Sequence, residues 1–200
     1  SPIRSTYFVD EADFVSCSLD TYCFKFDMVR NLKKGGTFLL NTTVDADKLE
    51  NHLPNRMLKG LAEKEAKFYV INANKIAAEV GMGRRTNTIL QSAFFALNEQ
   101  IMPLTDSIGY MKYMAKKSYS KKGEEIVQAN YNAIDAGKDG LVRVEVKPEW
   151  KNLTVAAKAT TGDDYFDKHL TEINNLNGND LPTSHFLNWN LLDGSIRNEV

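Results

Sequence analysis

The sequence has 200 residues, of which 42% are hydrophobic and 26% are charged, and its formal net charge at pH 7 is -1. A chain of this size can bury one substantial hydrophobic core. Its near-neutral charge gives no domain-wide attraction to nucleic acid, and no stretch approaches the roughly 18 consecutive apolar residues that a membrane-spanning helix needs. We therefore expect a globular protein that binds neither nucleic acid nor a membrane.

The sequence offers few metal ligands. It contains two cysteines, Cys17 and Cys23, and three histidines scattered along the chain. Two thiols are too few for a disulfide framework or a four-thiolate cluster, and their spacing matches no zinc motif. Because no signal-peptide pattern opens the chain, we expect a reducing compartment, and we predict no metal site in this chain.

The first forty residues predict strands on either side of a helix. Ser1 and Pro2 are typical of a cut inside a longer protein rather than of a natural start. Apolar residues recur at helical spacing over residues 19–32, which predicts an amphipathic helix, and the basic, glycine-containing run 33–36 is typical of a helix end. Strands are predicted over residues 3–9, 12–17 and 37–41.

The middle of the chain alternates between strand and helix. Aromatic and β-branched residues at 67–71 fit a buried strand. Periodic apolar residues predict helices over residues 45–52, 54–65, 74–80, 89–97, 106–119 and 123–136. This alternation favours an α/β fold with a Rossmann-like, mostly parallel sheet flanked by helices.

A double-glycine turn, Gly81-Met82-Gly83, separates two of these helices and is followed by Arg84, Arg85 and Asn87. Free N–H groups and the positive dipole end of the second helix would point out of this turn, and arginine adds forked donors for phosphate or carboxylate oxygens. One interpretation is therefore an anion site at a helix N-terminus. The alternative is a glycine helix cap followed by solvated or ion-paired arginines.

Ligands of such sheets bind beyond the carboxyl ends of the strands. The turn over residues 81–87 and the turn over residues 41–43 are both predicted to lie there, which favours the anion-site interpretation. The sequence shows no Ser/His/Asp order and no paired carboxylates at helical spacing, so we predict no catalytic residue. The residues alone indicate a phosphate-binding α/β part of a larger protein.

The composition changes after residue 138. Residues 142–146 alternate like an exposed strand, and residues 151–200 are rich in Asn, Asp, Thr and Gly, with one short helix predicted over 164–174. We predict a domain over residues 1–147 and an irregular C-terminal arm, or connector, over residues 148–200.

Five stretches of the chain resemble pyruvate:ferredoxin (flavodoxin) oxidoreductase and its relative pyruvate:NADP⁺ oxidoreductase. They are PIRSTYFVDEADFVSC (Pro2–Cys17), KKGGTFLLNT (Lys33–Thr42), AKFYVINANKIAAEVGMGRRTNTILQSAFF (Ala66–Phe95), KKGEEIVQAN (Lys121–Asn130) and GNDLPTSHF (Gly178–Phe186). The resemblance implies the gamma-type domain, the third in the family, without its upstream glycine-rich loop, followed by a connector toward an iron–sulfur domain. Residues 187–195 depart from the family pattern, which leaves the route of this connector open.

The resemblance also implies a reaction. Members of the family decarboxylate pyruvate on thiamine diphosphate with Mg, pass electrons through 4Fe-4S clusters to ferredoxin, flavodoxin or NADP⁺, and transfer the acetyl group to coenzyme A. Thiamine diphosphate, Mg and the clusters would lie in other domains of the same polypeptide, so this fragment alone would be inactive. The full-length enzyme is expected to be a homodimer located in the cytoplasm or, alternatively, in a hydrogenosome or mitochondrion-related organelle.

The gamma-type domain is linked in this family to coenzyme A binding. By resemblance, Asn87 and Asn130 are the predicted coenzyme A contacts, with Arg84 and Arg85 as candidates for its phosphates. The alternatives are a helix-surface amide at Asn130 and inter-domain ion pairs at the arginines. Two other functions stay open for the whole chain, namely a purely structural inter-domain or dimer-contact module and an independent nucleotide-binding protein.

Overall fold

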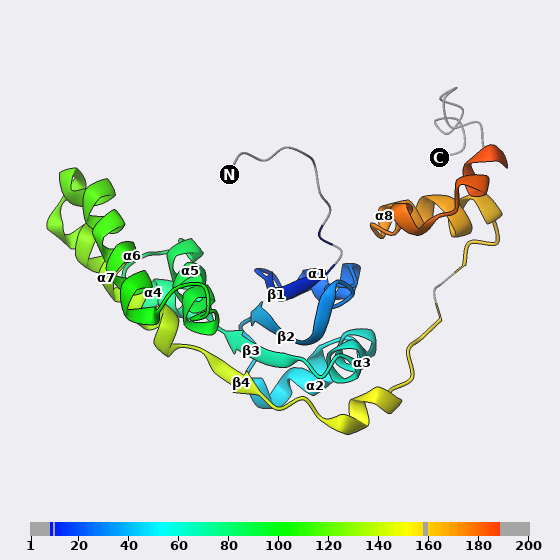
Figure 1. Ribbon diagram of the computed structural model, residues 1–200, viewed down its shortest axis with the longest axis horizontal. Helices are drawn as coiled ribbons and strands as arrows, with labels where there is room; N and C mark the ends of the chain where they lie inside the picture. Colours follow the sequence, from blue (N-terminus) through cyan, green and yellow to red (C-terminus); the bar gives the residue numbers. More distant parts are fainter. Residues whose placement is uncertain (1–8, 10, 158–159, 189–200) are drawn as a thin grey trace.

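The computed structural model of the protein describes residue 9, residues 11–157 and residues 160–188 (Figure 1). The strand predicted over residues 3–9 therefore falls almost entirely outside the described residues. So does most of the segment 187–195, where the sequence departs from the family pattern.

Four strands form one sheet in the order in which they occur along the chain. They are β1 (Ala12–Cys17), β2 (Leu32–Asn41), β3 (Lys67–Ile71) and β4 (Val142–Val144). The first three are parallel, and β4 runs antiparallel to β3, with Val70 opposite Val142. The predicted α/β fold with a mostly parallel sheet flanked by helices is confirmed.

Alternation along the central strands gives the sheet two buried faces. Phe38 and Leu40 of β2 point into a core shared with α2 (Leu49–His52) and α3 (Asn55–Glu63). Leu39 points to the opposite core, shared with α4 (Ala73–Glu79), α5 (Asn87–Leu97) and α7 (Glu124–Asp139). The helix α6 (Leu104–Tyr119) packs against α5 and α7, and Figure 1 shows α4 to α7 gathered toward the carboxyl ends of the parallel strands.

The long helix predicted over residues 19–32 is wrong. Only α1 (Thr21–Lys25) is helical, the backbone is extended at Phe26, and Leu32 already belongs to β2. The apolar residues at helical spacing therefore belong to different elements. In α1 only Cys23 is buried, whereas Val29 packs beside Gly60 of α3.

The run 33–36 does not end a helix either. It lies inside β2, at a point where the pairing register between β1 and β2 shifts. Gly35 has a φ of +74°, a left-handed conformation that favours glycine. The two glycines therefore form an irregularity in a strand rather than a helix cap.

The other predicted helices are confirmed, with ends shifted by a few residues. Residues 45–52 form a 3₁₀ turn (Ala46–Lys48) followed by α2. The helical segment predicted over residues 164–174 comprises a π-helical turn (Phe166–Leu170) and α8 (Thr171–Asn174). Among the described residues, no helix combines the length and apolarity that crossing a bilayer requires.

The chain beyond β4 remains attached to the domain. A 3₁₀ turn over Pro148–Asn152 packs against α3, and the Trp150 side chain, 2% exposed, completes the core on that face of the sheet. Farther along, Asn177 and Asp180 both accept hydrogen bonds from the Arg30 guanidinium. The division predicted at residue 147 stays a prediction, although a buried residue of the core lies just beyond it.

Candidate functional site

The double-glycine turn ends α4 with a Schellman motif. The Met82 amide donates to the Ala77 carbonyl oxygen at 2.8 Å, and the Gly81 amide donates to the Ala78 carbonyl oxygen at 3.4 Å. Gly81 and Gly83 have φ values of +76° and +62°. The Met82 side chain is 4% exposed and packs into the core, so the turn is fixed in place by a buried anchor.

The basic side chains of this turn face solvent. Arg84, Arg85 and Asn87 are all exposed. The Arg85 Nε donates to the Met82 carbonyl oxygen at 3.1 Å, and within the described part of the chain no carboxylate forms an ion pair with either arginine. The first turn of α5 also has no side-chain cap. This surface therefore presents uncapped amides and two available guanidinium groups, as an anion site would, although the glycine cap at Gly81 is present too.

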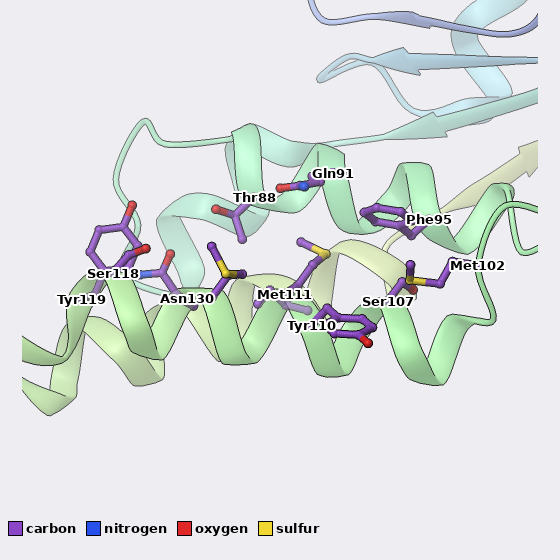
Figure 2. A pocket seen from close by; sticks show the side chains of 13 residues that line it. Thr88, Gln91, Phe95, Met102, Ser107, Tyr110, Met111, Ser118, Tyr119 and Asn130 are labelled. Carbon is purple, nitrogen blue, oxygen red and sulfur yellow. The ribbon is translucent and has the colours of Figure 1, made fainter. Parts of the chain in front are cut away.

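A cavity of about 290 Å³ lies between α5, α6 and α7 (Figure 2). Its wall is mostly apolar and includes three methionines, with polar groups at intervals. The lining residues are Thr88, Gln91, Phe95, Met102, Ser107, Tyr110, Met111, Met114, Ala115, Ser118, Tyr119, Asn130 and Ile134. We call this cavity the groove, and an apolar groove with a few convergent polar groups is typical of a small-molecule site.

Asn130 is one of two buried polar residues in the wall of this groove, the other being Ser107. Asn130 is 2% exposed, and its Nδ2 donates to the Ile126 carbonyl oxygen at 2.7 Å, one turn earlier in α7. Its side-chain carbonyl oxygen accepts no hydrogen bond from any residue that the structure describes. Asn130 is therefore not the exposed helix-surface amide that the sequence left open as an alternative.

Only one of the four predicted site residues lies in the wall of the groove. Asn130 lines the cavity, whereas Asn87, Arg84 and Arg85 do not. Thr88, the residue after Asn87, does line it, and Figure 2 shows Thr88 toward the same end as Asn130, Ser118 and Tyr119. The basic turn thus enters α5 at the end of the groove where the buried amide lies.

Sequence reasoning missed the α6 wall of the groove. Tyr110 and Met114, which are 63% and 52% exposed, and the half-buried Met111 all face the cavity or its rim. One sequence pattern could have indicated this wall, because the apolar residues at helical spacing on α6 cover a face too wide for a helix that is buried on one side. Such a pattern does not reveal the partner helices, which come from other parts of the chain.

A second group of polar residues lies at the carboxyl edge of the sheet. Asn41 donates to the Ser18 carbonyl oxygen at 3.0 Å and accepts from the Ala73 amide at 2.9 Å. Asp20 accepts from Thr42 Oγ1 at 3.0 Å and lies 3.3 Å from His52 Nε2. These contacts hold the ends of the parallel strands together. Across the described residues, no group of three or more His, Cys, Asp or Glu side chains could hold a metal ion.

The sheet order and the helices on both faces define an α/β domain, and a solved protein shares this fold. The crystal structure of pyruvate oxidoreductase subunit PORC from Thermotoga maritima matches with a TM-score of 0.53, covering 68% of this chain and 67% of that one at 20% identity. An identity this low bears on the fold alone.

The sequence comparisons establish the family. The family model described as pyruvate ferredoxin/flavodoxin oxidoreductase matches residues 1–140. A pyruvate-flavodoxin oxidoreductase from Enterobacter agglomerans is 40% identical over 93% of this chain, and a pyruvate:ferredoxin oxidoreductase from Moorella thermoacetica is 37% identical over 92% of it. The chain therefore belongs to the pyruvate ferredoxin/flavodoxin oxidoreductase family.

Relatives of this chain carry different enzyme names. A pyruvate dehydrogenase [NADP(+)] from Cryptosporidium parvum is 33% identical over 92% of this chain. The chain spans 16% of the length of the Moorella and Enterobacter relatives and 11% of the Cryptosporidium relative. The matched region is thus a small part of each of these proteins.

Proposed function

We propose that this chain is the gamma-type domain and connector of a pyruvate oxidoreductase, and that the domain contributes to coenzyme A binding. In the proposed reaction the full-length enzyme oxidatively decarboxylates pyruvate to acetyl-CoA and passes electrons to ferredoxin, flavodoxin or NADP⁺. Membership in the family and the names of the relatives support the reaction.

The observation that carries the coenzyme A proposal is the buried Asn130 amide in an apolar groove that begins beside a basic turn. Coenzyme A combines a narrow pantetheine arm, which carries two amides, with a phosphorylated nucleotide. The Asn130 carbonyl oxygen would accept a hydrogen bond from the arm, and the methionine and aromatic side chains would cover its hydrocarbon. Arg84, Arg85 and the uncapped amides of α5 would bind the phosphates.

The remaining cofactors are proposed to bind elsewhere in the full-length protein. This chain has two cysteines, fewer than the four thiolates that an iron–sulfur cluster takes. The 4Fe-4S clusters are therefore assigned to other domains, and the family resemblance assigns thiamine diphosphate and Mg to other domains as well. A homodimer in the cytoplasm, or in a hydrogenosome-like organelle, stays part of this proposal.

The test is calorimetric titration of the full-length enzyme with coenzyme A. Asn130→Leu keeps the branched shape and the number of heavy atoms and removes the amide, and we expect affinity to fall by about 3- to 10-fold, the effect of one hydrogen bond. Asn87→Ala and Arg85→Gln should weaken binding as well, and Arg85→Gln should also reduce its dependence on salt. The matched control is Lys67→Gln, because Lys67 is exposed at the start of β3. Equal affinity in all variants would refute the coenzyme A role.

A second candidate function is a structural contact between domains or subunits. It is favoured by exposed aromatic and sulfur side chains on α6, where Tyr110, Tyr113 and Met114 are each more than half exposed. On this alternative Tyr113→Lys would disturb assembly of the full-length enzyme, seen by analytical ultracentrifugation, while Asn130→Leu would leave the affinity for coenzyme A unchanged.

A further inference from the structure

The two cysteines of the chain lie against each other beneath the carboxyl edge of the sheet. Cys17 is the last residue of β1 and Cys23 lies in the middle of α1. Their sulfur atoms are 3.8 Å apart, and each residue is 1% exposed. No other thiol exists in this chain to compete for either of them.

The two thiols differ in acidity. The hydrogen bond between them is the largest influence on both, since it lowers the pKa of the Cys17 thiol and raises the pKa of the Cys23 thiol. Burial opposes the first effect and adds to the second, and the negative charge of Asp20 raises both. Cys17 is therefore the better thiolate of the pair, and Cys23 is the less acidic thiol beside it.

The cover over the pair is thin. The helix α1 has five residues, and no side chain caps its start. Leu19 and Tyr22 lie between the two cysteines in the sequence, and Phe24 follows Cys23. These three residues are 50%, 42% and 50% exposed. A short uncapped element with exposed side chains opens locally at low cost, so a small oxidant can reach the sulfur atoms without unfolding of the domain.

We propose that Cys17 and Cys23 form a reversible oxidation site that hydrogen peroxide converts to an intrachain disulfide. The Cys17 thiolate attacks a peroxide oxygen, the O–O bond breaks, and the released hydroxide takes a proton to become water. The Cys23 sulfur then attacks the resulting sulfenic sulfur, the S–O bond breaks, and the Cys23 proton leaves with the hydroxide as a second water. Two thiols lose two electrons in total, hydrogen peroxide gains them, and a dithiol reductant reverses the change.

The geometry suits this product. The sulfur atoms are already in van der Waals contact, and a disulfide requires them to approach to about 2.05 Å. The bond would tie α1 to the end of β1. Ser18, which follows Cys17, accepts the hydrogen bond from Asn41, and Asp20 accepts from Thr42. Oxidation would therefore act directly on the contacts that hold the strand ends together.

The experiment uses protein purified without oxygen and then treated with hydrogen peroxide, blocked with an alkylating reagent and digested. Trypsin leaves both cysteines in one peptide, residues 5–25. We expect this peptide to lose both alkylation sites, to become two hydrogen atoms lighter, and to recover on reduction. A second cleavage before Asp20 should give two fragments that stay joined until they are reduced.

Variants assign the roles. Cys23→Ser should stop the reaction at a sulfenic acid on Cys17, which dimedone would label. Cys17→Ser should show far less dimedone labelling. Two alkylated thiols after peroxide treatment, or oxidation only to sulfinic acid or to disulfides between chains, would overturn the proposal. The result on the unmutated protein decides this even if a serine variant does not fold.

Discussion

Gly137 of α7 lies directly against the backbone of Ile89 in α5. A Cβ placed on Gly137 would be 2.5 Å from the Ile89 carbonyl oxygen and 2.9 Å from the Ser92 Cβ. Ser92 Oγ in turn donates to the Ile134 carbonyl oxygen. We predict that Gly137→Ala forces the two helices apart and lowers the free energy of unfolding by about 1–3 kcal/mol, as measured by urea denaturation.

The matched control for this prediction is Gly109→Ala in α6. Gly109 is exposed and has open space around its Cβ position. Because alanine is the better helix former, this change should raise stability by about 0.5–1 kcal/mol. Equal effects of the two substitutions would contradict the close approach of α5 and α7, which forms the floor of the candidate groove.

The parts of the fold that the sequence predicted are those with strong local patterns. The strands Ala12–Cys17 and Lys67–Ile71 have the predicted ends, because β-branched and aromatic runs next to glycine or polar residues leave few alternatives. The helix over residues 19–32 failed because four apolar residues at helical spacing also fit a short helix, a bend and a strand. Tertiary contacts with α3 decided between these.

The candidate site was predictable only in part. The double-glycine turn could be read from residues 81–87, because positive φ angles at glycine are a local property. Asn130 came from the family resemblance, since nothing in its local sequence indicates that it faces a groove. Tyr110 and Met111 were missed because the groove exists only once α5, α6 and α7 have packed together.

A second prediction concerns Asn41, which joins the ends of β1, β2 and β3 through one buried amide. Asn41→Ala removes both hydrogen bonds and leaves the Ala73 amide without its partner. We expect a loss of about 1–3 kcal/mol in the free energy of unfolding. Asn74→Ala is the control, because Asn74 is exposed in α4, and it should change stability little.

A third prediction concerns pH. The Glu50 carboxylate accepts from Lys147 and from Trp150 Nε1, the second at 2.9 Å, and the first contact is the larger cause of a Glu50 pKa below its ordinary value of 4.5. Because the pKa is lower in the folded state, the unfolded state binds more protons as the pH falls. This stabilisation is present above about pH 4.5 and is lost as the pH falls through the lower folded-state pKa.

Urea denaturation from about pH 7 down to about pH 3 checks this sign. Glu50→Gln should be less stable than the unmutated protein at neutral pH and should approach it at the acidic end. A constant difference between the two proteins across the whole range would argue against the Glu50 contacts. The control is Glu63→Gln, because Glu63 is exposed at the end of α3, and its stability relative to the unmutated protein should not change with pH in this way.

A fourth prediction concerns the Schellman turn. Gly81 has a φ of +76° with open space at its Cβ position, so backbone strain rather than a clash opposes a side chain there. Gly81→Ala should lower the free energy of unfolding by about 1–2 kcal/mol. Gly81→Asn should lower it less, because asparagine tolerates this conformation. If alanine and asparagine were equivalent, the left-handed geometry at this position would be wrong.

The buried indole of Trp150 shows that the folded domain extends beyond the stretch that the family model matches. The family match ends at residue 140, whereas β4 pairs with β3 through Val142–Val144 and Trp150 fills the core beside α3. A polypeptide trimmed at residue 140 would bare one side of β3 and open a void as large as an indole. If such a polypeptide failed to fold, the cause would be the loss of β4 and of Trp150 rather than instability of the whole domain.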